Sequence, residues 1–98
     1  MASYQIMYWQ QIPSQIKVRD QTGTVKKMLP DRFQQAIDSA AMAKGETSSD
    51  DYLDGWHWAK KEERPGSAAE VADTLLIEIE TAYPQSRLRE IISAYAQR

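Results

Sequence analysis

The sequence has no cysteine and only one histidine, His57. Without thiols the chain cannot form disulfides, zinc–thiolate sites, iron–sulfur ligation or a cysteine nucleophile. With one imidazole, a metal site would need mainly carboxylate or backbone ligands. The sequence also has no glycine-rich phosphate loop, no nucleophile elbow and no HExxH motif. We therefore predict no catalytic residue, no metal and no cofactor.

Long apolar runs are also missing. No run approaches the roughly 18–20 residues of a membrane-spanning helix, and the N-terminal residues lack the basic and apolar regions of a secretory signal. We expect a cytoplasmic protein that does not insert into membranes. The 98 residues suffice for one domain, residues 1–98, and we expect a monomer or a weak dimer.

Charge is low overall but unevenly distributed. The formal net charge is −2, so no global positive field attracts nucleic acid. Residues 1–45 carry six Lys or Arg against three Asp, whereas residues 46–98 carry six against eleven Asp or Glu. This pattern indicates either two solvated faces of one domain or a bipolar surface that orients a partner.

The first thirty residues have the pattern of β-strands. The aromatic segment 4–9 predicts a first strand, and residues 15–19 alternate apolar and polar side chains. We expect Pro13 and Ser14 to separate these two strands. The turn residues 20–23 then allow segment 24–29 to return as the partner strand of a hairpin.

A fourth strand is predicted later, over residues 55–61. Its alternation would place Trp56, Trp58 and Lys60 on one face and would place His57, Ala59 and Lys61 on the other. Because a small sheet needs bulky side chains in its core, Trp56 and Trp58 are either core residues or part of an exposed surface.

Three segments have helical periodicity. Residues 31–44 carry an alanine-rich apolar stripe and precede Gly45, a typical C-cap. Ser67 and Glu70 have capping-box spacing before a strong apolar stripe, and Ser86 can begin a last helix after Pro84. The predicted fold is α+β, a small antiparallel or mixed sheet of about four strands with three helices packed on one face.

Several short motifs together resemble the bacterial virulence factor domain family, over roughly residues 4–93. They are residues 4–9, Ile12-Pro13, 15–20, Arg32-Phe33-Gln34, 36–38, 40–42, 52–56 with Trp58, and Ala82-Tyr83-Pro84. Members of that family occur as small stand-alone proteins, and a similar module is appended to helical-repeat proteins called conserved virulence factor C. The family often has a basic residue where this chain has Gln10. The resemblance supports an interaction or accessory domain, and it supplies no established catalytic residues to carry over to this chain.

The polar segment 46–54 contains Asp50, Asp51 and Asp54 but does not match a calcium loop. Aligning Gly55 with the invariant glycine places Tyr52 at a ligand position, and Lys61 occupies the place of the terminal glutamate. A turn with local hydrogen bonds from the aspartates explains the segment better.

The sequence therefore favours a non-enzymatic protein-interaction domain or an accessory subunit of a larger bacterial assembly. We expect another protein to contact Trp9, Lys17, Arg19 and Trp58, because Trp and Arg side chains dominate interface hot spots. The alternative is a small-ligand site, or an enzyme site completed by a partner, near Trp56, His57 and Trp58. Nucleic-acid binding by the hairpin ranks last because the protein is acidic.

Overall fold

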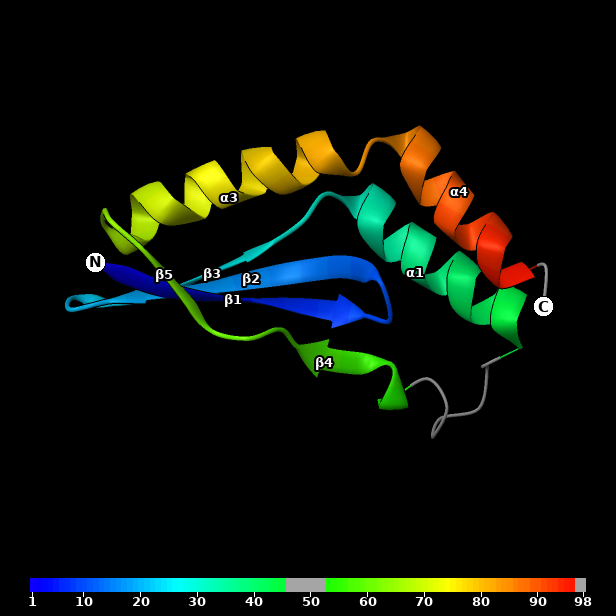
Figure 1. The fold of residues 1–98 in the computed structure, drawn as a ribbon, viewed down its shortest axis with the longest axis horizontal. Coiled ribbons are helices and arrows are strands. Elements are labelled where there is room, and N and C mark those ends of the chain that lie inside the picture. The colour runs from blue at the N-terminus through cyan, green and yellow to red at the C-terminus, as the bar shows by residue number, and fades with distance from the viewer. Residues whose placement is uncertain (46–52, 97–98) are drawn as a thin grey trace.

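The structure is a computed structural model that describes residues 1–45 and 53–96. Within these residues, strands β1 to β5 form one antiparallel sheet, in which β3, β2 and β1 lie in that order and β4 and β5 both pair with the outer edge of β1 (Figure 1). The strands are β1 Ala2–Trp9, β2 Ile12–Asp20, β3 Gly23–Met28, β4 Trp56–Trp58 and β5 Glu62–Arg64.

The β1–β2 connection is tighter than the sequence suggested. Strand β2 begins at Ile12 and includes Pro13 and Ser14, which we expected to separate the strands. Register shifts by one residue after Met7, so that Tyr8 pairs with Pro13. Proline within a sheet is tolerated where a bulge interrupts the ladder, which explains why it does not end this strand.

The β2–β3 hairpin forms as predicted. Its register pairs Lys17 with Lys26 and Asp20 with Gly23. The Asp20 carboxylate accepts hydrogen bonds from Thr22 and from the Gly23 N–H, which closes the turn. Its other oxygen accepts the Ala68 N–H of a distant helix at 2.7 Å, so this turn also positions the second half of the chain.

The single strand predicted over residues 55–61 is wrong in part: only Trp56–Trp58 forms a strand, β4, and residues 59–61 lead to a second short strand, β5, that the sequence did not predict. Trp58 pairs with Met7, and Glu62 pairs with Tyr4. Three residues, 59–61, therefore stand opposite the two residues between Tyr4 and Met7. The extra residue interrupts the ladder in the manner of a bulge and reverses the alternation of side chains beyond it.

Three helices, α1 Asp31–Lys44, α3 Ala68–Ala82 and α4 Gln85–Ala96, have their bounds within the described residues. Helix α3 packs across β2 and β3, α1 packs on β2, and α4 packs along α1 (Figure 1). The Ser67 hydroxyl caps α3 by accepting the Glu70 N–H, as the capping box predicts. Gly45 ends α1 with φ of 76°, the left-handed C-cap expected there.

The core lies between these helices and one face of the sheet. Ile16 and Val18 of β2 meet the apolar stripe of α3, which includes Val71 and Leu75, and all four are nearly inaccessible to solvent. The side chain of Arg32 ties α1 to the end of α3 by donating to the Glu80 carbonyl at 3.2 Å. The α+β class with an antiparallel sheet is thereby confirmed.

Candidate functional site

The face of the sheet opposite the core has no helix packed on it within the described residues. We call it the open sheet face. Alternation along the three long strands assigns its side chains, which are Ser3, Gln5 and Met7 of β1, Gln15, Lys17 and Arg19 of β2, and Thr24, Lys26 and Met28 of β3. Three of these nine are cations, and none is acidic.

Trp58 of β4 joins this face because it pairs with Met7. Its side chain is 38% exposed, although a buried position was one of the two expectations. The Lys17 ammonium lies 4.6 Å from the centre of the Trp58 ring. This is a cation–π contact at a partly solvated site, worth about 0.5–1 kcal/mol.

A hollow of about 110 Å³ lies beside this pair. It is lined by Ser3, Tyr4, Gln5, Lys17, Arg19, Thr24 and Lys61. The lining contains three cations and no carboxylate, and none of these cations forms an ion pair with another described residue. The hollow therefore has the electrostatic character of a site for an acidic group.

Lys61 belongs to the open sheet face, whereas alternation over residues 55–61 placed it on the face opposite Trp58. The prediction is wrong because the extra residue between β4 and β5 reverses the alternation after Trp58. A sequence pattern does not reveal such a slip, since it depends on where β1 ends its pairing with each short strand. Lys26 was not among the residues expected to contact a partner protein, although the hairpin turn alone places it opposite Lys17.

Trp9 does not lie on this surface. The structure therefore corrects our expectation that Trp9 is one of the residues that contact a partner. Its exposed fraction is 0%. The indole packs against Gly55, where an added Cβ would overlap the ring, and the Gln10 N–H donates to the Gly55 carbonyl at 2.9 Å. The segment that leads into β4 therefore covers the end of β1, which strand alternation alone cannot predict.

His57 lies on the helix side of the sheet, opposite Trp58. Its ring stacks on Tyr8 with 5.9 Å between centroids and 14° between planes. Its Nδ1 is 3.2 Å from the Gly55 carbonyl oxygen. Alternation along β4 places Trp58 and His57 on opposite faces of the sheet, as their spacing in the sequence predicted. The two side chains therefore do not converge on one site.

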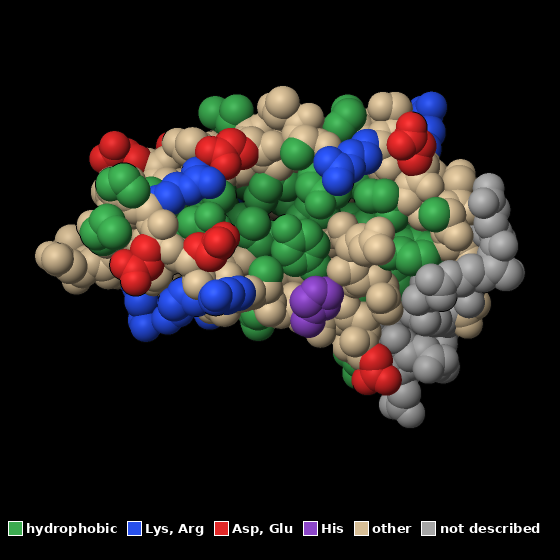
Figure 2. Space-filling model, in the orientation of Figure 1, with side chains coloured by type: hydrophobic (Ala, Val, Ile, Leu, Met, Phe, Trp, Pro, Cys, Tyr) green, Lys and Arg blue, Asp and Glu red, His purple; other side chains and the backbone are tan. Residues whose placement is uncertain are grey.

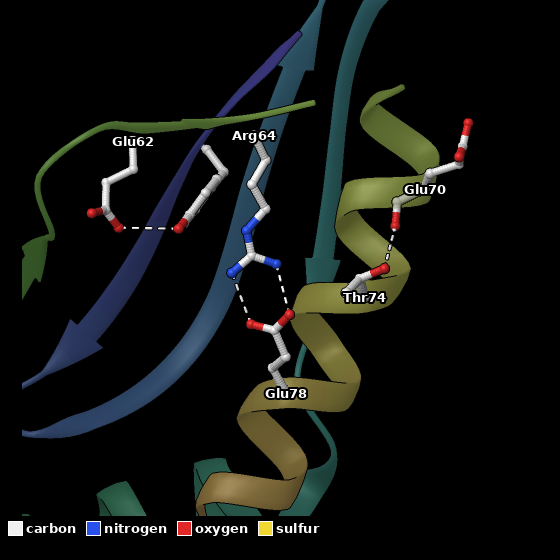
Figure 3. Close-up of polar contacts among 6 residues, drawn as sticks. Glu62, Arg64, Glu70, Thr74 and Glu78 are labelled. Atoms are coloured by element: carbon white, nitrogen blue, oxygen red, sulfur yellow. Dashed lines mark hydrogen bonds and ion pairs between the residues drawn. The ribbon is translucent and has the colours of Figure 1, made fainter. Parts of the chain in front are cut away.

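Polar contacts along β5 attach this edge strand to α3 and β1 (Figure 3). Arg64 forms a bidentate ion pair with Glu78 of α3, at 2.7 and 2.8 Å. The pair lowers the pKa of Glu78, chiefly through the hydrogen bonds from Arg64. The Tyr4 hydroxyl donates to the Glu62 carboxylate at 3.0 Å. The pKa of Tyr4 is raised mainly by burial and to a smaller extent by this hydrogen bond. These contacts place Lys61 and Glu63 at the edge of the open sheet face.

Metal binding finds no support in the described part of the chain, which contains no group of three His, Asp or Glu side chains arranged to hold an ion. Asp50 and Asp51 of the acidic segment lie outside the described residues, so the turn predicted there stays a prediction. None of the described helices is long and apolar enough to cross a membrane.

Comparison with known families gives one match. The model of a family described as "Virulence factor" matches residues 7–92, which is most of the chain. No curated protein and no solved structure matches the chain.

Proposed function

This chain belongs to the virulence factor family, and we propose that it is a protein-interaction domain that binds an acidic segment of a partner protein on the open sheet face. The observation that carries the proposal is the placement of Lys17, Arg19 and Lys61 around one hollow beside the exposed Trp58. Aspartate or glutamate side chains of a partner complement these cations, and the Trp58 ring supplies apolar contact area.

Charge supports this assignment because the open sheet face has the opposite sign to the protein as a whole. The formal net charge is −2, yet the hollow contains no acidic side chain. A local reversal of sign steers an acidic partner to this face and away from the remaining surface. Arg19 and Trp58 are the side-chain types that contribute most to interface hot spots.

The alternative of a ligand or partner-completed enzyme site at Trp56, His57 and Trp58 loses part of its basis. Trp58 lies on the open sheet face, whereas His57 stacks on Tyr8 at the helix side. The strand therefore contributes to two separate surfaces. A small-ligand or partner-completed enzyme site would have to lie on the His57 side alone.

A binding experiment with a fluorescein-labelled, glutamate-rich peptide tests the proposal. We expect an Arg19→Ala, Trp58→Ala double variant to stay folded, because both side chains are exposed. The same variant should lose binding, because it lacks a cation and the aromatic ring of the proposed contact surface. Lys26→Gln should weaken binding by about two- to fivefold, as loss of one solvated charge pair predicts. Lys27→Gln is the matched control, since Lys27 is adjacent on β3 but points to the other face.

Equal effects of Lys26→Gln and Lys27→Gln would contradict the proposal, and so would failure of the parent protein to bind the peptide. A single-stranded oligonucleotide serves as a second probe. If it binds this face more tightly than the peptide, with the steep salt dependence of phosphate contacts, nucleic acid replaces a protein as the partner.

A further inference from the structure

A second surface lies on the other side of the sheet, at the junction of α3 and α4. A groove of about 420 Å³ separates this junction from the end of β1 and from β4. Tyr8 and His57 lie on the strand side, and Tyr83, Arg87 and Ile91 lie on the helix side. Figure 2 shows hydrophobic side chains gathered in a band between the helices and this edge of the sheet. The groove shares no lining residue with the hollow on the open sheet face.

Aromatic rings lie on both sides of the groove, and Gln10 and Gln11 add polar amide groups to its lining. The stacked rings of Tyr8 and His57 form one wall. Tyr83, which is half-buried, and the aliphatic Ile91 form the other. Aromatic side chains on both sides of the groove can contact an aromatic ligand through ring–ring packing.

The helix side of the groove carries a positioned positive charge. The Arg87 guanidinium stacks on the Tyr83 ring, with 4.3 Å from its central carbon to the ring centre. Its Nη1 donates to the Ala82 carbonyl at 2.7 Å, which fixes the orientation of the group. Guanidinium has five N–H donors, so most remain available to an anion. No acidic residue belongs to the lining of the groove, and Arg87 forms no ion pair within the described residues.

The phenol of Tyr8 adds a neutral polar group. Burial raises its pKa, with smaller contributions from Tyr83, Glu62 and Tyr4. The hydroxyl therefore stays protonated at neutral pH and can donate to an oxygen acceptor. The groove thus combines a cation and a hydroxyl donor with aromatic and aliphatic side chains and the amides of Gln10 and Gln11.

We propose that this groove binds a small organic monoanion, a carboxylate attached to an aromatic body. The carboxylate lies against the Arg87 guanidinium, and the aromatic ring lies between the Tyr8–His57 stack and Tyr83. The volume is within the roughly 300–1,000 Å³ range of small-molecule sites. For a ligand of about a dozen heavy atoms in an open groove, we expect a millimolar dissociation constant.

The test is an NMR titration of the isotope-labelled protein with hydrocinnamate, a phenyl ring on a short carboxylate. We expect chemical-shift changes at Tyr8, His57, Tyr83 and Ile91. Hydrocinnamide, the uncharged analogue, should bind about tenfold more weakly, because it loses a charge-assisted hydrogen bond. Arg87→Gln should weaken hydrocinnamate by a similar factor. Arg87 is exposed, so this variant should fold like the parent.

Arg89→Gln is the matched control because Arg89 is exposed on the same helix and does not line the groove. Its affinity for hydrocinnamate should stay at the parent value. The proposal is overturned if hydrocinnamide binds as tightly as hydrocinnamate, or if Arg87→Gln and Arg89→Gln behave alike. Shifts confined to the open sheet face would overturn it as well. Because the two surfaces share no residue, each of these outcomes leaves the proposed protein-binding function unaffected.

Discussion

At the scale of single residues, the contact between Gly55 and Trp9 determines which aromatic side chains are exposed. Trp9 is completely buried because its indole lies directly against the Gly55 backbone. Gly55 has no positive φ that would demand glycine, so the requirement for a small residue is steric. The close approach explains why Trp58, and not Trp9, is the tryptophan available on the open sheet face.

Gly55→Ala should therefore lower the free energy of unfolding by about 1–3 kcal/mol, the usual range for overpacking in a core. The added Cβ would overlap the Trp9 ring, and the backbone or the indole must shift. Thermal and urea denaturation measure the effect. Adding Trp9→Leu should make the cost of Gly55→Ala smaller, because the leucine leaves room for the new methyl group.

Gly45→Ala is the control for this pair. It has φ of 76° and nothing within 4 Å of the added Cβ, so its cost of about 1–2 kcal/mol comes from backbone strain. Trp9→Leu should not change that cost. If it reduces the costs of Gly45→Ala and Gly55→Ala equally, the steric explanation for Gly55 is wrong.

At the scale of elements, α3 is the helix that covers the sheet. Its apolar stripe was predicted from spacing, and Val71, Ala72, Leu75 and Ile79 are all buried as that stripe requires. Ile77 on its outer face is 66% exposed. The contrast between the two faces of one helix provides a direct test of its packing.

Leu75→Ala should lower the free energy of unfolding by about 2–5 kcal/mol, since a buried leucine is lost and a cavity remains. Ile77→Ala removes a similar number of carbon atoms from the exposed face and should change stability by less than about 0.5 kcal/mol. Chemical denaturation of both variants gives the comparison. Similar midpoints for the two would mean that the assigned buried face of α3 is wrong.

At the scale of the whole molecule, Asp20 links the two halves of the chain. Its carboxylate accepts from the β2–β3 turn and from the Ala68 N–H at the start of α3. These hydrogen bonds lower the pKa of Asp20 from 3.8 to about 2, and the bond from the Ala68 N–H has the largest effect. The negative charge also lies near the positive end of the α3 dipole.

This shift predicts a pH dependence of stability. Because the pKa of Asp20 is lower in the folded state, its ionised form stabilises the fold above pH 3.8, and that contribution is lost as the pH falls toward 2. Asp20→Asn should therefore be less stable than the parent at neutral pH, and the difference should shrink between pH 3.8 and 2. Thermal melts across this range measure it.

Asp73→Asn is the control, because Asp73 is exposed on α3 and its side chain forms no hydrogen bond with another described residue. Its stability relative to the parent should not follow the pattern of Asp20→Asn. A stability difference for Asp20→Asn that stayed constant down to pH 2 would contradict the assigned hydrogen bonds.

Local patterns in the sequence determined the helices, the β2–β3 hairpin and the buried face of α3, because spacing, caps and turn residues act over a few positions. They also led to the prediction that Lys17, Arg19 and Trp58 contact a partner, and the shared face of these three side chains follows from strand alternation once the pairing is known. Only the tertiary structure decided the burial of Trp9 and the position of Lys61. Both depend on how residues 55–61 align along β1, and a one-residue slip between distant strands leaves no periodic signal in the sequence.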